Sequence, residues 1–165
     1  MKTLILNHLQ IEQKINRIAH EIYEYNYEEQ EIVIAGIADR GYVLAQKICN
    51  VLAKISPIKI KLLEIRIDKK NLTLDNFSLQ VNENDLTNKV VLVVDDVLNT
   101  GKTLIYAIHP FLKFNIKKIA TIVLVDRNHN LFPVRADYVG LSMATTLQEH
   151  VSVEFADGSD TVFLL

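Results

Sequence analysis

Two adjacent carboxylates, Asp95 and Asp96, stand in the segment VVLVVDDVLNTGKTL at residues 90–104. The apolar residues before them make a run long enough for a buried strand and too short for a buried helix. We therefore expect the carboxylates at the end of a strand over residues 90–94. A small-residue turn follows and leads into an amphipathic helix expected over residues 104–114. This order of elements predicts a binding site for an anion.

The turn after the carboxylates has the composition of a phosphate-binding loop. Its backbone N–H groups can donate to an anion, its Thr hydroxyls add donors, and Gly101 tolerates a positive φ and a close approach of the ligand. The carboxylates beside it suit ribose hydroxyls or a hydrated magnesium ion, which prefers oxygen ligands. A sugar phosphate is therefore the ligand that the pattern fits best. The loop residues are Asn99, Thr100, Gly101, Lys102 and Thr103.

A P-loop is one alternative, because Gly-Lys-Thr also ends the Walker A motif. That motif requires a glycine five positions before Gly101, where this chain has Asp96, and a carboxylate there would repel the phosphates. A second alternative is a strand that ends in two solvated carboxylates, followed by a helix with Thr100 or Thr103 as its N-cap. Each feature is ordinary in that interpretation, but the ordered combination favours the phosphate site.

Strands and helices alternate along the chain, which predicts an α/β fold with a parallel sheet and helices on both of its faces. The alternating strand at residues 58–67 is expected at an edge of the sheet, and the polar residues 68–88 are expected to form a mobile connection. The other strands are expected at residues 3–6, 32–37, 90–94, 119–125 and 138–139, the helices at 9–25, 42–55 and 104–114, and a terminal hairpin at 151–155 and 161–165.

Polar residues directly follow three of the apolar strands. They are Asp39-Arg40-Gly41, Asp95-Asp96 and Asp126-Arg127. Because ligands of parallel sheets bind beyond the carboxyl ends of the strands, these clusters are expected to converge on one crevice. Plainer interpretations stay open for two of them: Arg40 as a surface arginine, and Asp126 with Arg127 as an exposed turn with a local ion pair.

The composition fits one compact cytoplasmic domain. The chain has 165 residues, of which 49% are hydrophobic, so we expect a single domain over residues 1–165. The formal net charge of −2 gives no global positive field that would attract nucleic acid. A lone cysteine, Cys49, excludes an intramolecular disulfide and fits a reducing cytoplasm. No apolar run is long enough for a signal peptide or a membrane span, so we expect neither.

The segment at residues 90–104 resembles the signature with which type I phosphoribosyltransferases bind 5-phosphoribosyl-1-pyrophosphate (PRPP). The segments NRIAHEI, IAGIADRG and LVDRNHNLFPVRADYVG are similar to stretches of the PyrR branch of this family, whose members regulate pyrimidine operons and transfer phosphoribose to uracil. The resemblance covers most of residues 10–155. It implies the type I phosphoribosyltransferase fold, with a mostly parallel central sheet, helices on both faces, a small hood and a C-terminal hairpin.

The resemblance also implies a reaction, in which the phosphoribosyl group of PRPP passes to a nucleobase and pyrophosphate leaves. Uracil to UMP is the best single guess, and Mg²⁺ is the implied cofactor. Asp95 and Asp96 would hold the metal and the ribose hydroxyls, and the loop at residues 99–103 would hold the 5-phosphate. Arg40 and Gly41 would hold the pyrophosphate, which makes Asp95, Asp96 and Arg40 the implied catalytic residues. The residues that would contact the base are Val125, Asp126 and Arg127.

Three departures from the family pattern keep other functions open. Asp39 stands before Arg40, where relatives carry Lys or Thr, and brings a negative charge near the leaving group. Asn99 replaces an aspartate that has an assigned proton-transfer role in several purine enzymes. The lid expected after the third strand reads Asp-Lys-Lys-Asn at residues 68–71 in place of Tyr-Arg-Asp-Asp. A non-catalytic regulator that senses PRPP or nucleotides is therefore a second hypothesis, and a phosphoribosyltransferase for another base is a third.

The resemblance implies RNA as a further partner, which would require clustered basic residues. The similar stretches contain Arg17, His20, His129 and Arg135. A basic cluster is formed by Lys113, Lys117 and Lys118, but cations there also suit the C-terminus of the predicted helix. Apolar residues expected to be exposed indicate a face for a homodimer or a higher homo-oligomer. They are Leu131, Phe132 and Met143.

Overall fold

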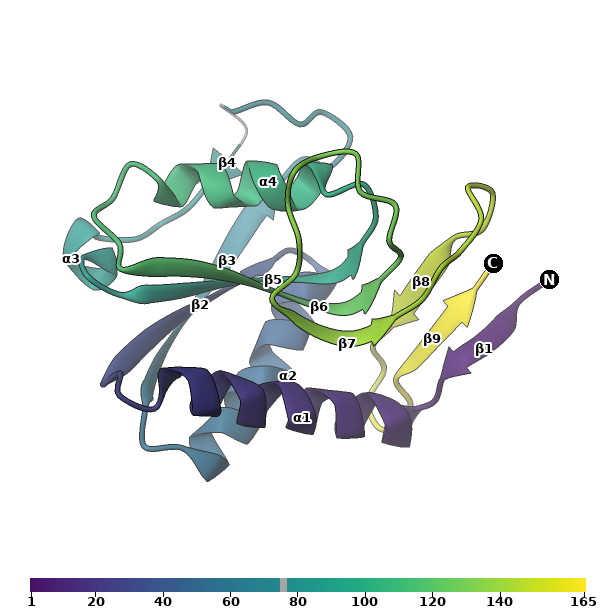
Figure 1. The fold of residues 1–165 in the computed structure, drawn as a ribbon, viewed down its shortest axis with the longest axis horizontal. Helices are drawn as coiled ribbons and strands as arrows, with labels where there is room; N and C mark the ends of the chain where they lie inside the picture. The colour runs from purple at the N-terminus through teal and green to yellow at the C-terminus, as the bar shows by residue number, and fades with distance from the viewer. Residues whose placement is uncertain (75–76) are drawn as a thin grey trace.

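The computed structural model describes residues 1–74 and 77–165, and its centre is a six-stranded sheet (Figure 1). The strands lie in the order β4-β3-β2-β5-β6-β7, and neighbours are parallel except for β4, which runs antiparallel to β3. The predicted parallel sheet is therefore confirmed. The strand bounds are Glu31–Ile37 (β2), Lys59–Ile67 (β3), Phe77–Ser78 (β4), Val90–Leu98 (β5), Lys118–Asp126 (β6) and Tyr138–Ser142 (β7).

Helices cover both faces of this sheet, as Figure 1 shows. α1 and α2 pack on one face, where Ile32 and Ile34 of β2 are fully buried. α3 and α4 lie on the other face, against Val33 and Ala35. Alternate residues of one strand thus enter two separate core layers, because side chains of a strand point to opposite faces in turn. The helix bounds are His8–Asn26 (α1), Arg40–Ile55 (α2), Glu83–Leu86 (α3) and Lys102–Ile108 (α4).

Local sequence explains where the helices begin and end. The side chain of Asn7 accepts from the backbone N–H of Gln10, and the side chain of Gln10 accepts from that of Asn7, so a capping box starts α1. The helix predicted over residues 104–114 is wrong in its bounds, because α4 begins and ends earlier and a 3-10 turn, His109–Phe111, follows it. Pro110 has no N–H for an α-helical bond and would clash with the preceding turn, which explains the early end.

The signature strand is longer than predicted. β5 continues through both carboxylates to Leu98, because it stays paired with β6 to its end. Its pairing with β2 stops earlier, at Gly36 and Val94. Asp95 and Asp96 therefore lie inside the strand rather than after it, at the point where β5 has lost one of its two neighbours.

A second, antiparallel sheet of order β1-β9-β8 lies to one side of the first and forms the hood (Figure 1). Its strands come from residues that are far apart in the sequence, since β1 pairs with β9. The predicted first strand and the predicted terminal hairpin are confirmed. The bounds are Thr3–Leu6 (β1), Val151–Glu154 (β8) and Thr161–Leu164 (β9).

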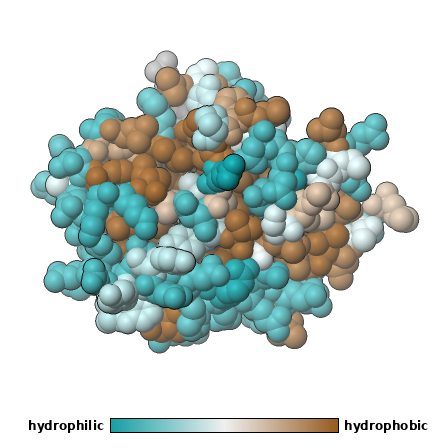
Figure 2. All heavy atoms as spheres, in the orientation of Figure 1, coloured by the Kyte–Doolittle hydropathy of each residue, from teal (hydrophilic) through white to brown (hydrophobic). Residues whose placement is uncertain are grey.

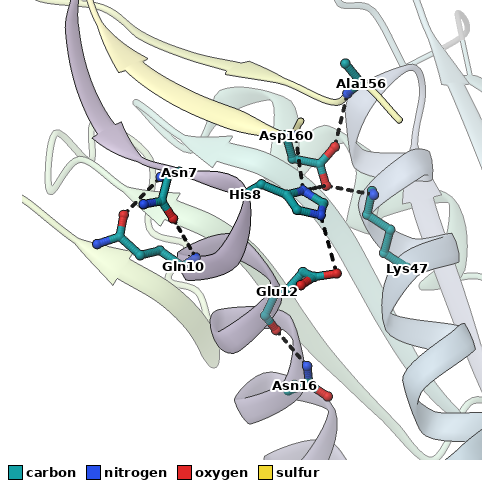
Figure 3. Close-up of polar contacts among 8 residues, drawn as sticks. All are labelled: Asn7, His8, Gln10, Glu12, Asn16, Lys47, Ala156 and Asp160. Carbon is teal, nitrogen blue, oxygen red and sulfur yellow. Dashed lines mark hydrogen bonds and ion pairs between the residues drawn. The ribbon is translucent and has the colours of Figure 1, made fainter. Parts of the chain in front are cut away.

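A buried carboxylate attaches the hood to the two helices beneath it (Figure 3). Asp160 precedes β9 and is 1% exposed. Its Oδ2 lies 2.8 Å from Nζ of Lys47 on α2 and 3.5 Å from Nδ1 of His8 on α1. Its Oδ1 accepts from the backbone N–H of Ala156 at 3.0 Å, which closes the hairpin turn. The hood is therefore held to the helices by charge as well as by packing.

The polar connection expected over residues 68–88 contains β4 and α3, and its residues 75–76 lie outside the described residues. β4 pairs with Arg66 and Ile67, so β3 lies next to the edge rather than at it. Within the part of the chain that the structure describes, no helix has the length and apolar composition needed to cross a bilayer.

Candidate active site

Asp95 and Asp96 are buried carboxylates at the centre of the site. Only 4% of Asp95 and 6% of Asp96 is exposed. The backbone N–H of Asp96 donates to Oδ1 of Asp95 at 3.0 Å. Burial, and then the charge of Asp96, raise the pKa of Asp95 well above the ordinary carboxyl value. A cation that joins the pair would therefore relieve an unfavourable concentration of negative charge.

Two cationic side chains already lie beside the pair. Nζ of Lys69 is 3.7 Å from Oδ1 of Asp95, and Nη1 of Arg40 is 3.7 Å from Oδ2 of Asp96. The side chains of Lys69 and Arg40 are 44% and 55% exposed, so they approach the carboxylates from the solvent. An anionic ligand in the same space can compete for both cations.

The carboxylates open into a cleft of about 850 Å³, which is within the usual size of a small-molecule site. Its wall combines side chains of both charges, and Val151 at the start of β8 adds an apolar surface from the hood. The cations in the lining are Arg40, Arg66, Lys69 and Lys70, and the carboxylates are Asp39, Glu64, Asp68, Asp95 and Asp96.

Gly41 determines how closely α2 approaches β5. A Cβ at this position would lie 2.6 Å from the carbonyl oxygen of Val94 and 3.0 Å from the Cα of Asp95. Because glycine has no side chain, the first turn of α2 can lie directly against the strand. This close packing brings Arg40 to the carboxylates. The sequence predicted helix only from residue 42, but Arg40 and Gly41 are the first residues of α2.

The predicted phosphate loop encloses a small cavity beside the cleft, here called the loop cavity. All of residues 99–103 line it. Its volume is about 40 Å³, roughly three times the ~10–15 Å³ that one water needs, which leaves room for a group of several oxygen atoms. Gly101 has a φ of 87°, and a Cβ there would lie 2.6 Å from Cγ1 of Val134. Gly101 is also the N-cap of α4, so the alternative with Thr100 or Thr103 as N-cap is wrong.

The loop after β6 supports the phosphate loop from outside. The backbone N–H groups of Leu131 and Phe132 both donate to the carbonyl oxygen of Thr100, at 2.8 and 3.1 Å. Nη1 of Arg127 donates to Oδ1 of Asn99 at 2.7 Å. The shape of the phosphate loop therefore depends on residues that follow the next strand.

The residues predicted to contact a base do not line the cleft in the described structure. The side chain of Val125 is fully buried in the core, so its predicted contact with a base does not fit its position. Oδ1 of Asp126 accepts from the backbone N–H of Asn128 at 2.8 Å. Arg127 is 7% exposed and points toward Asn99 and the segment before β8.

The cleft also contains residues that sequence reasoning missed. Lys69 and Lys70 stand out in the sequence only as departures from the family lid, although two adjacent cations directly after a strand are themselves a signal of an anion site. Arg66 is on the alternating strand β3, where its position indicates a solvent-facing residue. Val151 gives no signal, because the position of the hood depends on pairing between distant strands.

Basic residues considered for RNA binding have partners within the chain or lie elsewhere than predicted. Nη2 of Arg17 donates to two carbonyl oxygens of β7, at 3.0 and 2.7 Å. The Nε2 atom of His129 lies 2.6 Å from a carbonyl oxygen of the segment before β8. Because α4 ends at residue 108, a helix C-terminus does not account for the lysine cluster. Lys113 and Lys117 lie in the connection to β6, and Lys118 begins that strand.

The apolar residues expected on a dimer face differ in exposure. Leu131 is 80% exposed, whereas Phe132 and Met143 are half-buried. A surface groove of about 440 Å³ lies between the end of α4 and the start of β6, and Figure 2 shows hydrophobic side chains gathered over α4. The apolar residues that line the groove are Ile108, Leu112, Ile116, Ile119, Pro133 and Val134.

The two carboxylates of the site are suited to bind a metal ion that arrives together with a substrate. No group of three or more His, Cys, Asp or Glu side chains is arranged for a metal among the described residues. Mg²⁺ commonly binds one or two carboxylates and takes its remaining ligands from water and substrate phosphates. Asp95 and Asp96 suit that mode of binding and do not form a complete site of their own.

A family model described as the phosphoribosyl transferase domain matches residues 2–156. The chain belongs to this family and is a phosphoribosyltransferase. It is 36% identical to the bifunctional protein PyrR of Streptococcus gordonii, over 99% of this chain and 98% of that protein. It is also 36% identical to the bifunctional protein PyrR of Clostridium kluyveri, over 95% of this chain and 92% of that protein. The resemblance found in the sequence is thereby confirmed.

The fold is shared with a solved enzyme of the same class. The hypoxanthine phosphoribosyltransferase of Trypanosoma cruzi superposes with a TM-score of 0.76 at 18% identity, covering 90% of this chain and 84% of that one. At this identity the similarity concerns the fold alone. The parallel sheet with a small antiparallel sheet beside it is thus the type I phosphoribosyltransferase fold.

Proposed function

We propose that this phosphoribosyltransferase uses PRPP as its donor and uracil as its acceptor, forming UMP and releasing pyrophosphate. The observation that carries the proposal is the position of Asp95 between two cavities. Together with Val97, Asn99 and Thr103, it lines both the loop cavity and the cleft. PRPP carries a phosphate and a pyrophosphate on two sides of one ribose. Such a ligand would fill the loop cavity with its 5-phosphate, set its ribose over the carboxylates and extend its pyrophosphate into the cleft.

The residues around the ribose would stabilise the charges that develop during the transfer. As the base attacks the anomeric carbon, the bond to pyrophosphate breaks, and the ribose gains oxocarbenium character while negative charge grows on the leaving group. Asp95 and Asp96 would bind the ribose hydroxyls and favour the positive ribose, and Arg40 would donate to the pyrophosphate. Mg²⁺, when bound by the two carboxylates, supplies further positive charge to the pyrophosphate oxygens.

The choice of uracil rests on the resemblance to the PyrR branch along residues 124–140. The base would lie on the hood side of the cleft, with Val151 against its ring. Asn99 can donate and accept hydrogen bonds but cannot act as a base, which argues against the proton transfer assigned to purine enzymes. A cytoplasmic location and a homodimer or higher homo-oligomer are part of the same proposal, and sedimentation would test the oligomeric state.

A PRPP-sensing regulator is the second candidate function, because Asp39 lies in the wall of the cleft. Its negative charge beside Arg40 opposes the charge that grows on pyrophosphate. This would slow the transfer without preventing PRPP from binding. Binding of RNA would belong to this candidate.

A turnover assay that follows pyrophosphate release from PRPP with Mg²⁺ tests the proposal. Uracil, hypoxanthine, guanine, adenine and orotate are supplied in turn, and release with uracil alone is the expected result. Release with another base would overturn the choice of uracil. Absence of release with every base, together with measurable PRPP binding, would favour the regulator.

The site assignment has its own test in the double variant Asp95→Asn/Asp96→Asn. We expect it to lose Mg²⁺-dependent binding of PRPP in calorimetry. Asp157→Asn, in the exposed hairpin turn, removes a carboxylate of the same kind outside the site and serves as the control. Unchanged affinity in the double variant would show that the carboxylates are not the PRPP site.

A further inference from the structure

Arg127 is a buried cation with an unusual set of partners. It is 7% exposed, and its guanidinium makes hydrogen bonds with all three of its nitrogen atoms. None of these bonds is to a carboxylate. The acceptors are Oδ1 of Asn99 at 2.7 Å, Oγ1 of Thr145 at 2.9 Å, the carbonyl oxygen of Thr146 at 3.1 Å and the carbonyl oxygen of Glu149. The planar fork of an arginine is suited to hold several acceptors in one fixed geometry.

The partners of Arg127 belong to two different sides of the site. Asn99 is the first residue of the phosphate loop and lines both the loop cavity and the cleft. Residues 145–149 lead into β8, whose first residue, Val151, lines the cleft from the hood. His129 holds the same segment, since its Nε2 lies 2.6 Å from the carbonyl oxygen of Thr145. One side chain thus connects the phosphate side of the site with the hood side.

Arg127 also determines which end of the Asn99 amide faces it. A guanidinium can only donate, so it holds the amide oxygen of Asn99. The NH₂ group of that amide, with its two donors, remains for a ligand in the cavities that Asn99 lines. A phosphate or ribose oxygen entering there meets donors rather than an acceptor oxygen.

We infer that Arg127 is a positioning residue, and this inference rests on the proposed function. It fixes the amide of Asn99 for PRPP and the segment at residues 145–149 for the base, without touching either substrate. The binding of the two substrates is therefore linked through one guanidinium. This role differs from the direct base contact that the sequence implied for Arg127.

Three variants separate the two arms of this link. Asn99→Asp keeps an acceptor for Arg127, but it replaces the amide donors with a carboxylate beside the loop cavity. We therefore expect PRPP affinity to fall about tenfold with the KM for uracil unchanged. Thr145→Val removes a contact on the hood side, so we expect the KM for uracil to rise a few-fold with PRPP affinity unchanged. Arg127→Met is expected to change both, each by about tenfold or more. Calorimetry with PRPP and Mg²⁺, and uracil kinetics at saturating PRPP, give the two readouts.

The double variant Arg127→Met/Asn99→Asp tests whether Arg127 acts through Asn99. If it does, the two losses of PRPP affinity are not additive, because without Arg127 the amide of Asn99 is no longer held. Arg127→Lys retains the charge but not the fork, so we expect an intermediate effect on both substrates. A purely structural role would lower the thermal stability of these variants without dividing their effects between PRPP and uracil.

Each outcome decides the inference separately from the proposed function. Wild-type turnover combined with unchanged PRPP affinity in Arg127→Met would overturn the inference alone. If Arg127→Met does not fold, equal effects of Asn99→Asp and Thr145→Val on both substrates would overturn it. If the wild type releases no pyrophosphate with any base, the proposed reaction fails. PRPP calorimetry on the Asn99 and Arg127 variants then still tests whether Arg127 positions Asn99 for PRPP.

Discussion

Lys69 and Asp95 face each other in the cleft, with Nζ and Oδ1 3.7 Å apart. The carboxylate is buried and the ammonium is partly exposed, so a cation from the solvent side offsets part of the charge at the base of the cleft. When an anionic ligand enters, the same ammonium can bind the ligand instead. We therefore expect the partner of Lys69 to change when an anionic ligand binds.

Replacement of Lys69 by Gln is expected to weaken PRPP binding several-fold at low salt, because the cleft loses a cation close to the position of the pyrophosphate. The difference should shrink at high salt, which screens partly exposed charges. Calorimetry at two salt concentrations measures both effects. Lys54→Gln, on the exposed side of α2, removes the same charge far from the cleft and should bind PRPP as the wild type does. Equal affinities of wild type and Lys69→Gln at low salt would contradict this prediction.

The stability of the metal-free protein should depend on pH through Asp95. Burial, with the charge of Asp96, raises the pKa of this carboxyl from 3.8 to about 8. Well below pH 3.8 the carboxyl is protonated in both the folded and the unfolded protein, so it contributes no penalty. As the pH rises toward 8, ionisation favours the unfolded protein, and the free energy of unfolding should fall relative to that of Asp95→Asn. Urea unfolding in EDTA at several pH values checks this, and parallel curves for the two proteins would refute it.

Binding of Mg²⁺ with PRPP should show the opposite dependence on pH. A metal requires the ionised carboxylate, so binding releases a proton from the Asp95–Asp96 pair. We expect the affinity to rise by up to about tenfold per pH unit below the raised pKa. Calorimetry in buffers of different ionisation enthalpy would measure the released proton. A constant affinity between pH 6 and 8 would show that the carboxylates do not bind the metal.

Two glycines with positive φ distinguish backbone strain from a steric clash. Gly101 has a φ of 87° and a close neighbour in Val134, whereas Gly158 has a φ of 71° and no atom within 4 Å of the point that a Cβ would occupy. Gly158→Ala should cost about 1–2 kcal/mol of unfolding free energy. Gly101→Ala should cost about 1–3 kcal/mol more and also weaken PRPP binding, because the phosphate loop must move. Urea unfolding and calorimetry test this pair, and equal costs would mean that the loop adapts to the added methyl group.

Attachment of the hood should depend on the charge of Asp160. Asp160→Asn keeps the shape of the side chain and can still accept from Ala156, but it removes the charge that faces Lys47 and His8. We expect a loss of about 1.5–3 kcal/mol in unfolding free energy, with faster amide exchange in β8 and β9 than in β5. Asp157→Asn in the same turn is the control, because Asp157 is exposed. Uniform exchange across both sheets would argue that the hood does not open separately.

Much of the fold could be predicted because its strands and helices differ in hydrophobic period. The three-and-four spacing of Ile11, Ile15 and Ile18 identified α1, and the apolar run of β2 identified a buried strand. The end of β5 could not be found in this way, because Asp95 and Asp96 interrupt the apolar run although hydrogen bonds to β6 continue past them. The residues of one strand do not by themselves show how far its pairing with a neighbouring strand extends.

The candidate site was predictable where its residues are adjacent in the sequence. The phosphate loop and the carboxylates come from one continuous segment, so their chemistry could be recognised together. The contact of Arg127 with Asn99 joins the loops that follow β6 and β5. The direction in which the Arg127 side chain points depends on how the loop after β6 folds back. Charge at position 127 suggested a ligand, whereas burial shows that the guanidinium is occupied by the chain itself.

The pairing of β1 with β9 has a consequence for how the protein is made. Thr3 pairs with Leu164, so the ribosome synthesises all six strands of the central sheet between the two partners. Contacts of such long range form late, because they must first overcome the entropy of closing a long loop. The sheet that carries the carboxylates and the phosphate loop can therefore assemble on the emerging chain. The hood cannot form until β9 has been synthesised. We therefore expect the phosphate side of the site to form during synthesis before the wall that would face the base.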